Sequence, residues 1–138
     1  MNKGAYRTRN VVLLLPLLVF ILGCGVSGRP VSIKISEIGT CYDYDRASNK
    51  PIDITDEFPS DTDQITVYFY AETNLQAEVT YRWFFENELI AEYYAPLERG
   101  YNFGWITPKD TWPEGEYKVE ILLAEVTLRS TSFQVVSP

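Results

Sequence analysis

The sequence predicts an all-β protein: an antiparallel β-sandwich of about seven strands that follows an N-terminal signal segment. Apolar and polar residues alternate with a period of two in most segments after residue 31, as in strands with one buried face. Pro, Gly, Asn and Asp separate these segments at short intervals. No stretch after residue 31 carries the 3.6-residue apolar stripe of an amphipathic helix.

The N-terminal segment has the organisation of a secretory signal. Residues 1–10 are polar and basic, and residues 11–22 are apolar. This run is too short to cross a hydrocarbon core of about 30 Å, which needs about 20 helical residues. A basic start, a short apolar run and small residues after it predict a signal peptide. A buried core helix is the alternative, but Pro16 would break it.

The apolar run ends in Ile21-Leu22-Gly23-Cys24. This tetrapeptide resembles the lipobox, the cleavage and lipidation motif of bacterial lipoproteins. Gly23 and Cys24 match the motif, whereas Ile21 stands where leucine is more usual and Leu22 is larger than the common small residue. The resemblance implies cleavage before Cys24 and attachment of acyl chains to it. Two or three acyl chains would hold the protein durably at a membrane.

The lipoprotein resemblance also implies a location. Residues 1–23 would be the signal peptide, and residues 24–30 the lipidated cysteine and a tether that reaches roughly 20 Å. Gly25 in place of aspartate implies the outer membrane in a Gram-negative organism, and otherwise the outer face of the cell membrane is expected. Ordinary secretion and an uncleaved anchor are the alternatives.

Composition limits the classes of function. The chain has 138 residues, 12 Lys and Arg against 19 Asp and Glu, and no histidine. Its length predicts a single domain at residues 31–138. The negative charge repels phosphates, so we expect no nucleic-acid partner. Without histidine, Ser-His-Asp and Cys-His catalysis is excluded, and zinc or copper would have to bind thiolates and carboxylates. We expect no enzyme, cofactor or metal.

The first half of the domain contains three alternating segments, at residues 31–35, 64–72 and 77–85. The polar stretch 45–63 predicts loops with at most one short strand near residues 52–54. Tyr68 and Tyr70 should point away from the core. The residues expected to face the core are Val31, Ile33, Ile35, Ile65, Val67, Phe69, Ala77, Val79, Tyr81 and Trp83.

The second half begins with Glu86-Asn87-Glu88, which predicts a hairpin turn into a strand at residues 89–95. Segments 101–106, 116–124 and 127–136 complete the set. Each places one group of residues on one side: Tyr101, Phe103 and Trp105 in the first, Tyr117, Val119, Ile121 and Leu123 in the second, and Thr131, Phe133 and Val135 in the third.

The segment Trp112-Pro113-Glu114-Gly115-Glu116-Tyr117 resembles the Pro-x-Gly-x-Tyr entry to strand F of immunoglobulin-like and fibronectin type III domains. The resemblance implies that the Tyr117 hydroxyl binds back to the preceding loop as a tyrosine corner. It also makes Trp83 the core tryptophan of such a domain. The inter-sheet disulfide of antibody domains is absent from the sequence. Both residues are expected to serve the fold.

Outward-facing aromatic residues suggest a binding surface. Phe84 and Leu122 are expected on neighbouring strands of one sheet, as a contiguous apolar patch. Tyr93 and Tyr94 are adjacent, so one of them should face solvent. The candidate binding residues are Arg82, Phe84, Tyr93, Tyr94 and Leu122. The alternative is that these aromatic residues are scattered and only support strand formation.

Acidic residues cluster in the polar stretch of the domain, and a second cysteine, Cys41, lies just before them. Asp43, Asp45 and the acids of residues 53–63 are interpreted as solvated loop residues, with a calcium site as the alternative. Cys41 begins an apparent strand, Cys41-Tyr42-Asp43-Tyr44, and is therefore expected to be a buried, inert thiol. An intermolecular disulfide, or a bridge to an unlipidated Cys24, is the alternative.

Together these features predict a lipid-anchored, extracytoplasmic, non-enzymatic binding or structural module of the cell envelope. Its partners would be the membrane, through acyl chains on Cys24, and an envelope protein or glycan. A carbohydrate-binding module that uses surface aromatic residues is the alternative. A small hydrolase with two catalytic carboxylates is the least favoured one.

Overall fold

The computed structural model describes residues 32–138, which form one compact unit. The predicted signal peptide (1–23) and tether (24–30), and with them Cys24, lie outside the described residues. Within residues 32–138, no helix is long and apolar enough to span a bilayer.

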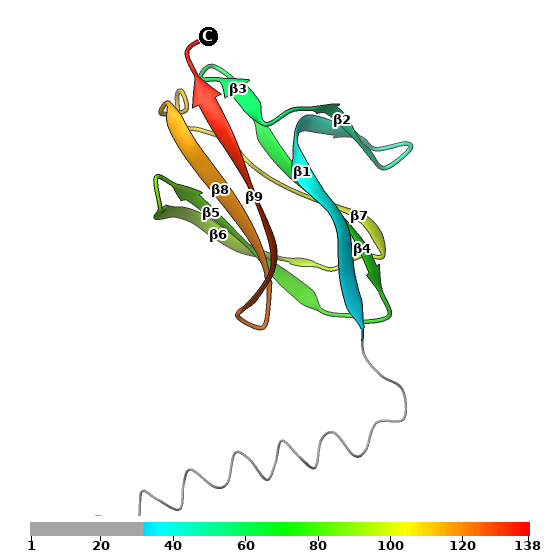
Figure 1. Ribbon diagram of the computed structural model, residues 1–138. Helices are drawn as coiled ribbons and strands as arrows, with labels where there is room; N and C mark the ends of the chain where they lie inside the picture. The colour runs from blue at the N-terminus through cyan, green and yellow to red at the C-terminus, as the bar shows by residue number, and fades with distance from the viewer. Residues whose placement is uncertain (1–31) are drawn as a thin grey trace, which may run out of the picture. The chain divides into compact units, whose positions relative to one another are not determined.

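The described residues form nine strands in two facing sheets (Figure 1). The four-stranded sheet has the order β2-β1-β4-β7, and the five-stranded sheet the order β3-β9-β8-β5-β6. The strands are β1 (Ile33–Asp45), β2 (Lys50–Ile54), β3 (Glu57–Pro59), β4 (Ile65–Thr73), β5 (Glu78–Phe85), β6 (Glu88–Pro96), β7 (Gly100–Ile106), β8 (Gly115–Leu123) and β9 (Val126–Val136). The predicted all-β sandwich is confirmed.

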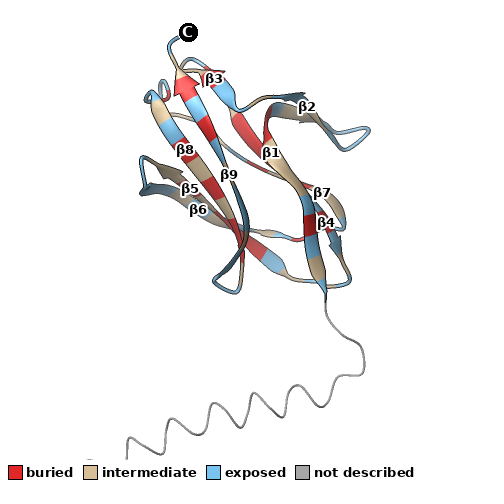
Figure 2. Ribbon diagram, viewed as in Figure 1, coloured by how far each residue is buried: buried red, intermediate tan, exposed pale blue. Residues whose placement is uncertain are grey.

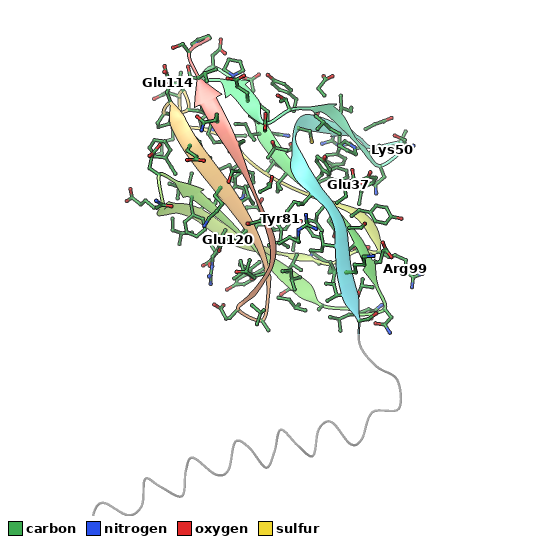
Figure 3. The ribbon with its side chains drawn as sticks, in the orientation of Figure 1. Glu37, Lys50, Tyr81, Arg99, Glu114 and Glu120 are labelled. Carbon is green, nitrogen blue, oxygen red and sulfur yellow. The ribbon has the colours of Figure 1, made fainter. Side chains whose placement is uncertain are left out.

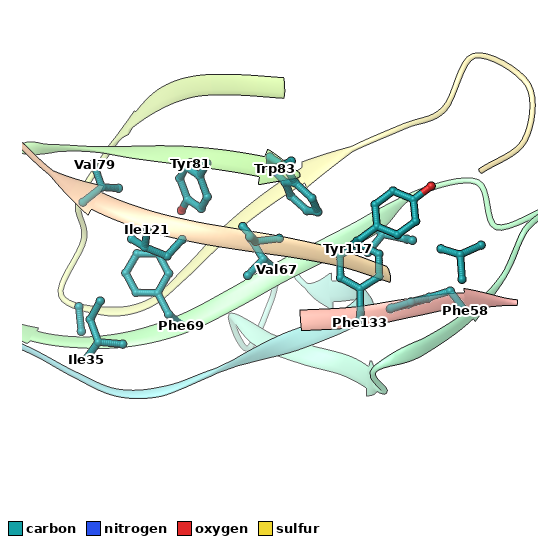
Figure 4. Close-up of a cluster of buried hydrophobic side chains, with 14 of the residues drawn as sticks. Ile35, Phe58, Val67, Phe69, Val79, Tyr81, Trp83, Tyr117, Ile121 and Phe133 are labelled. Carbon is teal, nitrogen blue, oxygen red and sulfur yellow. The ribbon is translucent and has the colours of Figure 1, made fainter. Parts of the chain in front are cut away.

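The core lies between the two sheets, and the long strands β4, β5 and β8 contribute alternate residues to it (Figures 2 and 4). Val67 and Phe69 of β4 face Trp83 of β5 and Val119 of β8, and all four are fully buried. The Tyr117 hydroxyl donates a 2.6 Å hydrogen bond to the Pro113 carbonyl oxygen. The predicted tyrosine corner and the core position of Trp83 are therefore confirmed.

The stretch 45–63 contains two strands, so the expectation of at most one is wrong. The expected strand near residues 52–54 is β2, and the missed one is β3, which pairs in parallel with β9. Phe58 holds β3 in place, because it is fully buried and its ring centroid lies 5.6 Å from that of Phe133. A single apolar residue in a polar run has no periodicity, which explains the miss.

Strand β1 is one continuous strand that includes residues 33–35 and 41–44, which the sequence predicts as two separate strand segments. A bulge between Ile35 and Glu37 adds one residue to the strand. Ile35 and Ile38 therefore both pack against the core, three positions apart. The bulge changes the phase of the alternation, so a strict period of two ends there.

Candidate functional site

The predicted binding patch lies on the outer face of the five-stranded sheet. Thr80 and Arg82 of β5 pair with Leu122 and Glu120 of β8, which places Leu122 on the face that carries Arg82. Leu122 is only 2% exposed, so its expected role in an exposed patch is wrong. An ion pair joins Arg82 of β5 to Glu125 in the turn that follows β8.

The rest of that face is divided by charges. Arg82 donates hydrogen bonds to both Glu92 and Glu125, and these bonds raise the pKa of Arg82. The ammonium group of Lys118 lies 5.0 Å from the ring centroid of the half-buried Phe84. Tyr94 is 65% exposed. A contiguous apolar patch is therefore not formed.

Tyr93 points to the opposite side, toward the core edge between β6 and β7. Its ring stacks on Tyr81 at 5.1 Å. Its hydroxyl accepts a hydrogen bond from Trp83 Nε1 at 3.4 Å and donates one to the Trp105 carbonyl oxygen at 3.2 Å. Burial raises the pKa of Tyr93 to about 12. Tyr93 thus connects the two sheets, and Tyr94 is the member of the pair that faces solvent.

Aromatic residues of β4 and β7 form a second surface, on the outer face of the four-stranded sheet, and Tyr44 of β1 contacts it. Tyr70 and Tyr101 are paired across β4 and β7, with ring centroids 5.0 Å apart. Tyr101 lies 6.1 Å from Phe103, which stacks on Tyr44 at 4.1 Å. Trp105 follows, 6.0 Å from Tyr44. We call Tyr44, Tyr70, Tyr101, Phe103 and Trp105 the aromatic strip.

Polar groups fix the orientation of the rings in the strip. The Tyr101 hydroxyl donates to the Glu37 carboxylate at 3.0 Å, and the Arg46 guanidinium lies 4.5 Å from the ring centroid of Tyr44. Trp105 is 43% exposed and Tyr70 37%. The two ends of the strip therefore offer the most ring surface to a ligand.

Two hollows flank Trp105. One, of about 520 Å³, lies between Trp105 and the residues Phe85, Ile90 and Lys109. The other, of about 500 Å³, is lined by Trp105 and Phe103 together with Asn49 and Arg99. Figure 3 shows Arg99 just before the start of β7. It also shows Tyr81, which lies between the two sheets and borders the second hollow. Trp105 belongs to the aromatic strip and lines both hollows.

The acidic loops contain no arrangement that would bind a metal ion in the part of the chain that the structure describes. Asp43, Asp61 and Asp63 line one hollow, and Asp43 lies 3.7 Å from Arg46. Cys41 is a buried free thiol, as predicted. Burial is the main cause that raises its pKa to about 11.

Sequence reasoning missed the aromatic strip as a unit, although it contained parts of the signal. The alternation placed Tyr70 outward, and it placed Tyr101, Phe103 and Trp105 on one side of their strand. The missing information was the pairing of β4 with β7, which brings these two groups onto one face. That pairing links residues about 30 positions apart and leaves no local pattern.

No protein-family profile and no curated protein sequence matches the chain. Its fold is similar to that of an immunoglobulin-like protein from Pseudomonas aeruginosa, with a TM-score of 0.58 and 12% identity over 79% of this chain and 100% of that one. An alkylpurine DNA glycosylase from Pseudomonas fluorescens, bound to DNA, gives a TM-score of 0.49 and 14% identity over 84% of this chain and 33% of that one. The described residues thus have an immunoglobulin-like β-sandwich fold.

Proposed function

We propose that the protein is a lipid-anchored, extracytoplasmic, non-enzymatic binding module of the cell envelope, and that it contacts its ligand through the aromatic strip. The strip is the observation that carries this proposal. Five aromatic side chains form a continuous line along one sheet, and its ends are exposed. Large, rigid rings provide contact area at little cost in conformational entropy, and tyrosine adds a polar tip.

The strip supports binding better than the predicted patch does. In the patch, Arg82 is already paired with two carboxylates, so a ligand would have to compete with them. In the strip, the stacking of Phe103 on Tyr44 and the bond from Tyr101 to Glu37 hold the rings in place before any ligand arrives. A preorganised surface loses less entropy on binding.

The lipid anchor is supported by the sequence, through Ile21-Leu22-Gly23-Cys24 and the apolar run before it. The test is intact mass spectrometry of the native protein extracted from membranes, with Cys24→Ser as the control. We expect the mass of residues 24–138 plus two or three acyl chains, and loss of this species in the control. An unmodified mass with cleavage at another position would contradict the anchor.

The binding role has a separate test. Photo-cross-linking in intact cells, with the probe placed at Lys109 beside Trp105, should yield a defined adduct. Trp105→Ala should abolish it, whereas Tyr94→Ala on the other sheet should not. If the adduct survives Trp105→Ala and disappears in Tyr94→Ala, the binding surface is the outer face of the five-stranded sheet and the strip has a structural role.

A further inference from the structure

The hollow beside Trp105 and Phe103 combines aromatic and polar walls. Its volume is about 500 Å³. Rings of β7 form one side, and Asn49, Glu98 and Arg99 provide amide, carboxylate and guanidinium groups. Ligand sites for small molecules are typically concave, mostly apolar and lined by a few placed polar groups. The hollow has this composition and lies at the Trp105 end of the strip.

The polar side of the hollow is held in place by a buried side chain. Asn102 is only 4% exposed, and its amide nitrogen donates to the carbonyl oxygens of Glu98 at 2.8 Å and Gly100 at 3.1 Å. Its amide oxygen accepts a bond from the Glu98 backbone N–H at 2.8 Å. The loop that carries Glu98 and Arg99 is therefore clamped. The third group, Asn49, lies in a turn whose backbone is held by the hydrogen bond from the Asn49 backbone N–H to the Asp45 carbonyl oxygen at 2.6 Å.

The charges at the hollow are balanced, although the chain as a whole carries a net charge of −7. One carboxylate, Glu98, and one guanidinium, Arg99, line it. A ligand hydroxyl can donate to the first and accept from the second. An anionic or cationic ligand would leave one of the two facing a like charge, which costs affinity.

The ring that can receive a flat ligand face is Trp105. Tyr44 is covered by Phe103 at 4.1 Å and by the Arg46 guanidinium at 4.5 Å. Trp105 is instead tilted by 36° to Tyr44 at a centroid distance of 6.0 Å, and it is 43% exposed. A pyranose ring presents one face of C–H groups and a rim of hydroxyls, and therefore matches an aromatic surface that is bordered by donors and acceptors.

We propose that this hollow binds an uncharged saccharide, with a pyranose ring on Trp105 and its hydroxyls paired with Asn49, Glu98 and Arg99. This rests on the binding role proposed above and names its ligand class. The site would make the protein a glycan-binding module whose specificity excludes charged sugars.

The tryptophans provide a direct readout. Of the three in the chain, Trp83 and Trp112 are buried, with 0% and 3% exposure, so acrylamide quenches Trp105 selectively. The full chain is extracted in a detergent without a sugar headgroup, such as lauryldimethylamine oxide. It is then titrated with neutral oligosaccharides of glucose, mannose, galactose and N-acetylglucosamine, and with uronic-acid and sialylated oligosaccharides as the charged set. At least one neutral oligosaccharide should protect Trp105 from quenching, and the charged set should not.

Variants identify the site by immobilised-glycan binding. Trp105→Ala should weaken binding of the active neutral oligosaccharide by about tenfold or more, while Trp105→Phe keeps most of it. Arg99→Met should weaken it with only a small change in thermal stability, because it also removes the long hydrogen bond of 3.4 Å from Arg99 Nε to the Thr73 carbonyl oxygen. Val126→Ala, at the exposed start of β9, is the matched control. Binding that persists unchanged in Trp105→Ala overturns the site.

Three further outcomes show whether this inference, the proposed function or both are wrong. If no neutral oligosaccharide binds, but a protein adduct depends on Trp105, the saccharide site is wrong and the binding role stands. If only charged oligosaccharides bind, the saccharide class proposed from the balanced charges is wrong. If neither glycan nor protein binding depends on Trp105, both proposals fall.

Discussion

The Tyr117 hydroxyl is a single group that connects the start of β8 to the loop before it. It donates to the Pro113 carbonyl oxygen at 2.6 Å, while its ring stacks on Phe133 at 5.0 Å. The ring contributes to the core, and the hydroxyl fixes the path of the loop. The two contributions can be separated by removing the oxygen alone.

Tyr117→Phe should therefore lower the free energy of unfolding by about 1 kcal/mol, because it removes one hydrogen bond and keeps the packed ring. Urea unfolding followed by fluorescence measures this. Tyr70→Phe, at a 37% exposed position, is the control and should unfold like the parent chain. A loss for Tyr117→Phe no larger than the control's would show that the corner is not stabilising.

Gly104 is required by close packing behind the aromatic strip. A Cβ atom at this position would lie 2.5 Å from Cε2 of Tyr81 and 2.8 Å from the hydroxyl oxygen of Tyr93. Both partners are held: Tyr81 is 1% exposed, and Tyr93 is bonded to Trp83 and Trp105. The site thus depends on a glycine that does not itself contact a ligand.

Gly104→Ala should lower the free energy of unfolding by about 2 kcal/mol, as expected when a methyl group is forced into a packed interior. It should also displace β7, and with it Trp105. Urea unfolding measures the first effect, and acrylamide quenching of Trp105 the second. Unchanged values for both would show that the two tyrosines move aside without cost.

At the level of elements, the two tight hairpin turns of the five-stranded sheet have the same geometry and different residues. Glu86 and Asn87 have φ angles of 48° and 72°, and Ala124 and Glu125 have 50° and 69°. Such turns match the twist of the strands but need positive φ at both positions. Asparagine tolerates this conformation, whereas alanine does not favour it.

Ala124→Asn should therefore raise the free energy of unfolding by roughly 0.5 kcal/mol, because it relieves the left-handed strain. Ala124→Val should lower it, since a β-branched residue at positive φ is more strained than alanine. Thermal unfolding of the pair measures both signs. Equal midpoints for the asparagine and valine variants would contradict the assignment of strain to Ala124.

The strands also show how much of the fold can be predicted from the sequence. Alternation identified the cores of seven strands, because a strand with one buried face must alternate. It missed β3, which depends on one residue, Phe58, and on parallel pairing with the distant β9. It also did not join residues 33–35 and 41–44 into the single strand β1, because the bulge after Ile35 changes the phase. Local patterns carry no information on either feature.

The site was partly predictable for the same reason. Alternation assigns a residue to a face, and it placed Leu122 outward correctly. It does not report how far other side chains cover that face, and Leu122 is only 2% exposed. The predicted exposure of Leu122 was therefore wrong, although the predicted face of the sheet was right. The aromatic strip needed the β4–β7 pairing before its members could be joined.

At the level of the whole molecule, one thiol and two phenols make the free energy of unfolding depend on pH in the alkaline range. Burial raises the pKa of the Cys41 thiol from 9.0 to about 11. Burial, followed by the charge of Glu86, raises that of Tyr117 from 10.0 to about 12. Burial raises that of Tyr93 to about 12 as well. In each case the folded state favours the protonated form.

These three groups should therefore leave stability unchanged between neutral pH and pH 9 and lower it above pH 9. The unfolded chain releases the Cys41 proton near pH 9 and the tyrosine protons near pH 10, while the folded chain retains them until about pH 11 and about pH 12. The thiol's contribution is lost between pH 9 and 11, and those of the two phenols between pH 10 and 12. Urea unfolding at pH 8, 9.5 and 10.5, with a reductant present, measures the decline. Cys41→Ala should delay its onset from pH 9 to pH 10, because only the phenols then titrate. Parallel curves for the variant and the parent chain would show that the thiol is not buried in the folded protein.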